Sequence, residues 1–99
     1  MYTMIERRQV NPARLQETID RAQSEYFPLL QRAPGFVGFS LVPEEASGIN
    51  TAIVVWESKA QADAFLPELN RWMQVLDEYG HTVLSDNRGE TVFQLQAQA

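Results

Sequence analysis

The chain of 99 residues contains no cysteine and only one histidine, His81. Without cysteine it forms no disulfide, no thiolate metal site and no thiol nucleophile. With a single imidazole, a metal site would depend on carboxylates, which here fall in segments typical of solvated turns, so we expect no metal. No apolar run approaches the roughly 20 residues of a membrane span, and the first ten residues lack the basic-then-apolar order of a signal peptide. We therefore expect a cytoplasmic protein without a membrane partner.

Basic residues are also few: 8 Lys and Arg against 13 Asp and Glu give a net charge of −5. A nucleic-acid binder shows a basic footprint, so we expect no nucleic-acid partner. The hydrophobic content of 44% and the charged content of 21% are typical of a globular chain. The length predicts a single domain over residues 1–99.

Hydrophobic periodicity and turn residues predict six elements in the order β-α-β-β-α-β. Asn11-Pro12 and Ser58, with Gln61 three residues later, are helix-start signals. Pro28 and Pro67 should kink or interrupt the two helices. The expected strands cover 2–10, 36–42, a segment starting at 49 or 51 and ending at 57, and 91–96, with a turn at 87–89 and a possible short strand at 81–84. This order predicts an α+β, ferredoxin-like fold, with a four-stranded antiparallel sheet and both helices on one face.

Both faces of the middle hairpin carry apolar side chains. One face carries Val37, Phe39 and Leu41 with Ala52, Val54 and Trp56, and the other carries Phe36 and Val42 with Ile53 and Val55. Two helices cover only one face, and soluble monomers rarely expose large apolar patches. We expect a second copy of the sheet to cover the other face, giving a two-fold homodimer. A bent C-terminal segment covering this face within one chain is the alternative.

Two segments carry a resemblance to a known family. The sequence APGFVGF at 33–39, between a helix and a strand, and VWES at 55–58, leading into a helix, resemble the antibiotic biosynthesis monooxygenase family. The resemblance extends over about residues 2–97 and implies dimeric α/β barrels built from ferredoxin-like subunits. The family includes cofactor-free quinol oxygenases, haem-degrading oxygenases and an isomerase, so its motifs specify the fold and not the substrate.

The haem-degrading branch of that family is not expected here. Its members carry an Asn on the first strand, a Trp early in the second helix and a His further along as the iron ligand. The corresponding positions of this chain hold Arg7, Phe65 and about Val75. Because the iron ligand is absent, the resemblance implies a protein that uses no cofactor.

Three residues are candidate catalytic groups. The family alignment points Arg7 at the helices, where it would hold a phenolate, an enolate or a carboxylate, although a salt bridge to a helix carboxylate is the alternative. His81 is the only side chain that titrates near neutrality without a shift, and it is either a general base or a flexible loop residue. Trp72 is either a pocket wall or part of the core.

Four further residues are candidate substrate contacts: Tyr26, Phe39, Phe65 and Asn50. Tyr26 lies on an apolar helical stripe, where aromatic residues more often pack the core, and Asn50 is more typical of a turn. In this fold the gap between helices and sheet is also where ligands bind.

Two functions of different class fit these residues. The first is a cofactor-independent monooxygenase acting on a small aromatic or quinol-type substrate, whose anion reduces oxygen. The second is a non-catalytic small-molecule-binding or regulatory dimer. An isomerase or lyase acting on a small keto compound is a third interpretation.

Overall fold

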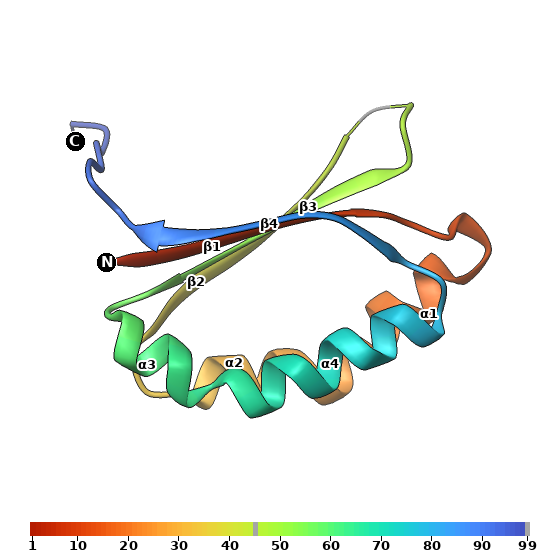
Figure 1. Ribbon diagram of the computed structural model, residues 1–99, viewed down its shortest axis with the longest axis horizontal. Coiled ribbons are helices and arrows are strands. Elements are labelled where there is room, and N and C mark those ends of the chain that lie inside the picture. Colours follow the sequence, from red (N-terminus) through yellow and green to blue (C-terminus); the bar gives the residue numbers. More distant parts are fainter. Residues whose placement is uncertain (45, 99) are drawn as a thin grey trace.

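The computed structural model describes residues 1–44 and 46–98. Its four strands form one antiparallel sheet in the order β2-β3-β1-β4. Both helical segments lie side by side along one face of this sheet (Figure 1). The strands are β1 (Tyr2–Gln9), β2 (Phe36–Pro43), β3 (Ile49–Trp56) and β4 (Thr82–Glu90). This arrangement confirms the predicted α+β, ferredoxin-like fold.

The first helical segment changes geometry along its length. The Asn11 side chain caps it by accepting the backbone N–H of Ala13 at 3.3 Å, as predicted. A 3-10 turn η1 (Pro12–Arg14), α1 (Leu15–Arg21), a π-helical turn η2 (Ala22–Tyr26) and α2 (Phe27–Arg32) then follow. Pro28 lies in the first turn of α2, where its missing N–H is tolerated, so the segment continues beyond it.

The second helical segment starts as predicted. The hydroxyl of Ser58 accepts the backbone N–H of Gln61 at 3.2 Å. Pro67 divides the segment into α3 (Lys59–Ala64) and α4 (Leu66–Glu78) and lies in the first turn of α4. Gly80, with φ +84°, follows the last turn in the left-handed conformation that suits glycine. No helix in the described part of the chain is long and apolar enough to cross a membrane.

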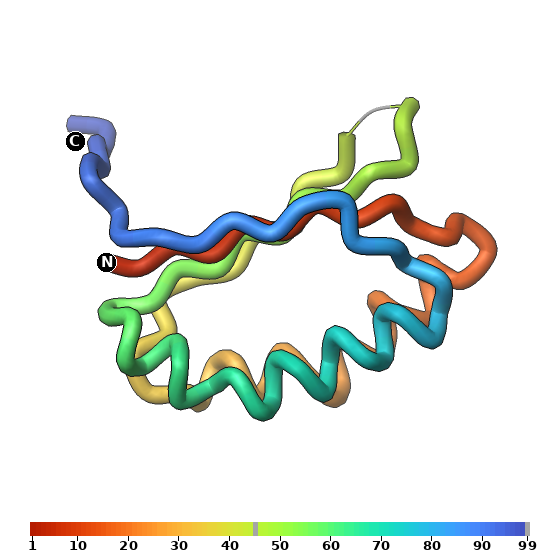
Figure 2. The backbone as a smooth tube through the Cα atoms, in the orientation of Figure 1, coloured from red at the N-terminus to blue at the C-terminus, as the bar shows by residue number. Residues whose placement is uncertain are grey.

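The predicted last strand is wrong. β4 covers Thr82–Glu90, so the expected turn at 87–89 lies inside the strand and the expected strand at 91–96 is not one. The reason is the register, because Glu90 pairs with Tyr2 and β1 has no residue left to pair with beyond it. The last backbone bond joins the N–H of Thr91 to the carbonyl of Met1 at 2.7 Å. From there the C-terminal residues leave the sheet (Figures 1 and 2).

The face of β1 that meets the helices is the opposite of the one expected. Tyr2 and Met4 join the core cluster, and Arg8, on the same face, is 5% exposed. Strand alternation therefore places Arg7 on the far face, which no helix covers (Figure 1). Alternation defines which residues share a face, but packing decides which face is covered.

A β-bulge alters the face assignment in β2. The register shifts between Phe36 and Gly38, so Phe36 points to the core and packs edge-on against Trp56, with ring centroids 5.8 Å apart. The prediction that Phe36 shares a face with Val42 is therefore wrong, because a bulge inserts one residue into the alternation. The buried core consists of Tyr2, Met4, Tyr26, Leu30, Trp56, Ala62 and Phe65.

Candidate functional site

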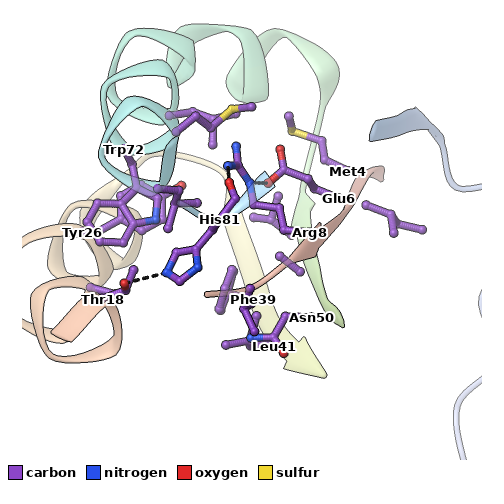
Figure 3. A pocket seen from close by; sticks show the side chains of 18 of the residues that line it. Met4, Glu6, Arg8, Thr18, Tyr26, Phe39, Leu41, Asn50, Trp72 and His81 are labelled. Atoms are coloured by element: carbon purple, nitrogen blue, oxygen red, sulfur yellow. Dashed lines mark hydrogen bonds and ion pairs between the residues drawn. The ribbon is translucent and has the colours of Figure 1, made fainter. Parts of the chain in front are cut away.

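A cavity of about 320 Å³ lies between the helices and the sheet. This volume is at the small end of the range of ligand pockets. All four strands contribute to one wall, and α1, η2, α2 and α4 contribute to the other. Its lining includes Met4, Glu6, Arg8, Thr18, Tyr26, Phe39, Leu41, Asn50, Trp72, His81, Asp86 and Arg88, ten of which are labelled in Figure 3.

Aromatic rings form the apolar side of the cavity. Tyr26 and Trp72 stack with centroids 5.0 Å apart and planes inclined by only 8°. Phe27 and Phe39 pack in a tilted pair at 5.2 Å. The π-helical turn η2 ends at Tyr26, and such turns are frequent at functional sites. Burial, with a smaller contribution from Glu6, raises the pKa of the Tyr26 hydroxyl above its ordinary value, so this phenol stays neutral.

The polar side of the cavity contains Arg8, a cation that is buried in the fold. Its Nη1 donates to the His81 carbonyl at 2.7 Å and to Asp77 Oδ1 at 2.9 Å, and its Nε donates to Glu6 Oε1 at 2.5 Å. Nη2 is buried and has no hydrogen-bond partner among the described residues. An unmatched buried donor costs free energy, so a ligand oxygen that accepts from Nη2 would be stabilised there.

In the described part of the chain two carboxylates, those of Glu6 and Asp86, line the cavity, and their hydrogen bonds differ. Asp86 is held by Arg88 at both oxygens, with N–O distances of 3.3 and 3.0 Å. Glu6 uses Oε1 for Arg8, and no hydrogen bond to its Oε2 is found in the described part of the chain. Glu6 is therefore the lining carboxylate with an oxygen available to a ligand.

His81 lines the cavity but is fixed within the protein. It is 2% exposed. Its Nδ1 accepts the backbone N–H of Asn11 at 2.9 Å, so the proton resides on Nε2, which donates to Thr18 Oγ1 at 2.8 Å (Figure 3). Burial and, to a lesser extent, Arg8 and Arg14 lower the pKa of His81, which keeps it neutral. The expectation of a flexible loop residue is wrong, and no free ring nitrogen remains for the general-base alternative.

Arg7 does not lie in the cavity. Its guanidinium forms an exposed ion pair with Glu44, with Nη2 and Oε2 2.9 Å apart. The expected position facing the helices is wrong, and so is the alternative of a helix carboxylate, because Glu44 follows β2 in the hairpin loop.

The four expected contact residues divide into two groups. Tyr26, Phe39 and Asn50 line the cavity with Trp72. Phe65 is instead part of the buried core, with its ring centroid 5.2 Å from that of Trp56 and 6.0 Å from that of Tyr26.

Sequence reasoning also missed Glu6 and Arg8 as cavity residues. The signal that could have found them is the series Tyr2, Met4, Glu6 and Arg8, which shares one strand face. Tyr2 and Met4 in this series are bulkier than Thr3 on the other face, which favours burial of the Tyr2 face under the helices. No group of three or more His, Asp or Glu side chains that could hold a metal occurs in residues 1–44 and 46–98.

Together, the fold and the cavity define a ferredoxin-like α+β protein with a largely apolar cavity between helices and sheet. The chain belongs to the antibiotic biosynthesis monooxygenase family, whose sequence model matches residues 1–68. No curated protein matches the sequence of this chain.

Solved structures share this fold at low sequence identity. SnoaB, a cofactor-independent oxygenase from Streptomyces nogalater, is 20% identical, with a TM-score of 0.68 over 98% of this chain and 97% of that one. A monooxygenase from Streptomyces coelicolor in complex with the ligand nanaomycin D is 13% identical, with a TM-score of 0.75 over 99% and 92%. A conserved protein from Methanosarcina mazei Go1 is 17% identical, with a TM-score of 0.73 over 89% of each chain.

Proposed function

We propose that this protein is a cofactor-independent monooxygenase that acts on a small aromatic or quinol-type substrate in the cavity. The observation that carries the proposal is that the cavity has an aromatic side and a polar side. A nearly parallel Tyr26–Trp72 stack lines one side of the cavity, and on the other side Arg8 has a buried N–H donor with no partner among the described residues. Flat rings favour stacking against aromatic side chains, and an oxygen substituent on the ring would accept from Arg8.

In this reaction the substrate itself is the reductant of O₂. A hydroxylated aromatic or anthrone-type compound loses a proton, and its anion transfers one electron to O₂. Recombination of the two radicals forms a peroxide. Cleavage of the O–O bond then leaves one oxygen as a carbonyl and releases the other as water, so a CH₂ group plus O₂ gives C=O plus H₂O. The protein contributes a water-poor site, orientation and stabilisation of the anion.

Oxygen consumption by the purified protein tests this function. With an anthrone as substrate, we expect protein-dependent O₂ uptake with one O₂ consumed per quinone formed. Arg8→Lys keeps a positive charge but loses the planar donor set, and we expect it to lower turnover by about tenfold or more, the size of one lost charge-assisted hydrogen bond. Arg7→Lys is the matched control, because Arg7 lies outside the cavity.

One outcome of this experiment would contradict the monooxygenase function. Tight binding of the anthrone without O₂ uptake would favour the non-catalytic binding protein instead.

The proposal includes a homodimer formed through the helix-free face of the sheet. Ile5, Ile53 and Val55 share this face by strand alternation and register, and Val42 is 51% exposed. Residues 91–98 leave the end of the sheet and do not return over this face (Figure 2), which supports cover by a second copy over cover within one chain. A second copy presents the same apolar surface, and a two-fold interface is self-complementary.

A further inference from the structure

Among the residues that the structure describes, six ionisable side chains line the cavity: Glu6, Arg8, Tyr26, His81, Asp86 and Arg88. A cofactor-independent oxygenation requires one group that accepts the substrate proton. The two arginines are donors only. The remaining four differ in whether an acceptor atom is left without a hydrogen bond in the described part of the chain.

Elimination among these four leaves one base. Both ring nitrogens of His81 are hydrogen-bonded to Asn11 and Thr18. Both oxygens of Asp86 are bound to Arg88. The Tyr26 hydroxyl is held protonated by burial. Glu6 keeps Oε2 available, because its contact with Arg8 uses Oε1.

We propose that Glu6 is the general base of the site and that Arg8 Nη2 holds the substrate oxyanion that this proton transfer creates. The inference rests on the proposed function and adds a catalytic pair to it. The O–H or activated C–H bond of the substrate breaks, the proton forms a bond to Glu6 Oε2, and the electron pair remains on the substrate. The proton later leaves on the oxygen that becomes water.

The local charges support this exchange. Before the transfer, the Arg8 guanidinium faces the carboxylates of Glu6 and Asp77. When Glu6 accepts the proton, it loses its negative charge and the substrate gains one, so the net charge beside Arg8 stays the same. Nη2, which has no partner among the described residues before the transfer, then donates to the new anion. Donors already in place for a developing charge cost no reorganisation during the reaction.

The geometry of Arg8 is fixed before a substrate binds. Nη1 bonds to Asp77 of α4. It also bonds to the backbone carbonyl of His81, which follows that helix (Figure 3). Glu6 and Arg8 are two residues apart on one face of β1. The base and the anion donor are therefore attached to a rigid strand instead of a loop, which favours precise positioning.

Glu6→Gln is the decisive variant, because its amide oxygen can still accept from Arg8 Nε but cannot take the proton. We expect O₂ uptake with an anthrone to fall by about 10² to 10⁴-fold, the usual contribution of a general base. Glu44→Gln is the matched control, since this exposed carboxylate pairs with Arg7 outside the cavity, and it should keep wild-type turnover. Full turnover by a folded Glu6→Gln protein would overturn the proposal.

A second measurement needs no turnover. Alizarin, a dihydroxyanthraquinone, changes colour when its phenol ionises, so its spectrum reports the bound anion directly. We expect wild-type protein to bind alizarin as the phenolate below the pH at which the free dye ionises, and Arg8→Lys to abolish this shift.

The two measurements separate the proposals. An inactive wild-type protein that still ionises alizarin through Arg8 would overturn the monooxygenase function and leave the proton-accepting pair intact. Active wild-type protein with an unaffected Glu6→Gln variant would overturn only the pair. Absence of both O₂ uptake and the alizarin shift would overturn both.

Discussion

The imidazole of His81 and the hydroxyl of Thr18 form a buried hydrogen bond of 2.8 Å, and the Thr18 hydroxyl donates in turn to the Arg14 carbonyl at 2.9 Å. This chain joins the C-terminal end of α4 to the start of α1. Only the neutral imidazole fits it, because Nδ1 must accept from the Asn11 backbone. His81 is thus a structural connection with a pH-dependent strength.

The protein should lose stability as the pH falls through the His81 titration. Burial and the nearby Arg8 and Arg14 lower the folded-state pKa of His81 below its ordinary value of 6.5. Between that lowered pKa and about 6.5 the unfolded state binds more protons, so the free energy of unfolding rises with pH. The contribution is fully present above the unfolded pKa and is lost as pH falls through the folded one.

Urea unfolding at several pH values between 5 and 7.5 measures this slope. His81→Asn keeps an acceptor near Asn11 but does not titrate, so we expect a shallower slope and a loss of about 1–3 kcal/mol at pH 7.5 from the altered buried hydrogen bonds. Equal slopes in both proteins would contradict the assignment.

Loss of the Trp72 ring should weaken the binding of flat aromatic ligands. Trp72 lies parallel to Tyr26 on the cavity wall, and an aromatic pair contributes about 0.5–1.5 kcal/mol beyond burial. Trp72→Leu should therefore raise the dissociation constant for alizarin about two- to tenfold, measured by titration calorimetry. Trp72→Phe keeps a ring and serves as the control, and equal affinities of the two variants would argue against stacking.

A charge in the middle of the helix-free sheet face should dissociate the dimer. Ile53 lies on β3, a central strand of the sheet, so Ile53→Glu places a carboxylate at the centre of the proposed interface, where an unpaired charge is costly. Sedimentation should give about twice the chain mass of 11.3 kDa for the wild type and a single-chain mass for the variant. Gln74→Glu adds the same charge on an exposed position of α4 and should stay dimeric. A wild-type protein that sediments as a single chain would exclude this interface.

Substitution of Gly35 should destabilise the protein more than substitution of Gly89. Its φ of +82° is costly for any residue with a Cβ, and that Cβ would collide with the side chain of Gln61, which belongs to the Ser58 cap. Gly35→Ala should lower the free energy of unfolding by about 1–3 kcal/mol, combining left-handed strain with a weakened cap. Gly89→Ala meets no atom within 4 Å and provides the control. Equal losses in the two variants would show that the Gly35 conformation is not limiting.

Features that depend on neighbouring residues were predictable from the sequence, and features that depend on distant residues were not. The Asn11 cap, the Ser58–Gln61 cap and the interruption at Pro67 were predictable because each depends on residues within one turn. The end of β4 was not, because it depends on where β1 begins, some 90 positions away in the chain. The same holds for Phe36, whose face is set by a bulge that only strand pairing reveals.

The order of elements, the family and the aromatic character of the site could be predicted from the sequence, since periodicity, capping residues and short motifs are local properties. The face of β1 that the helices cover depends instead on tertiary packing. That choice placed Arg8 and Glu6 in the cavity and Arg7 outside it, because burial of Tyr2 and Met4 and the contacts of Arg8 with Asp77 and the His81 carbonyl stabilise one orientation of the strand. It also fixed His81, which has no free ring nitrogen once Asn11 and Thr18 are packed against it.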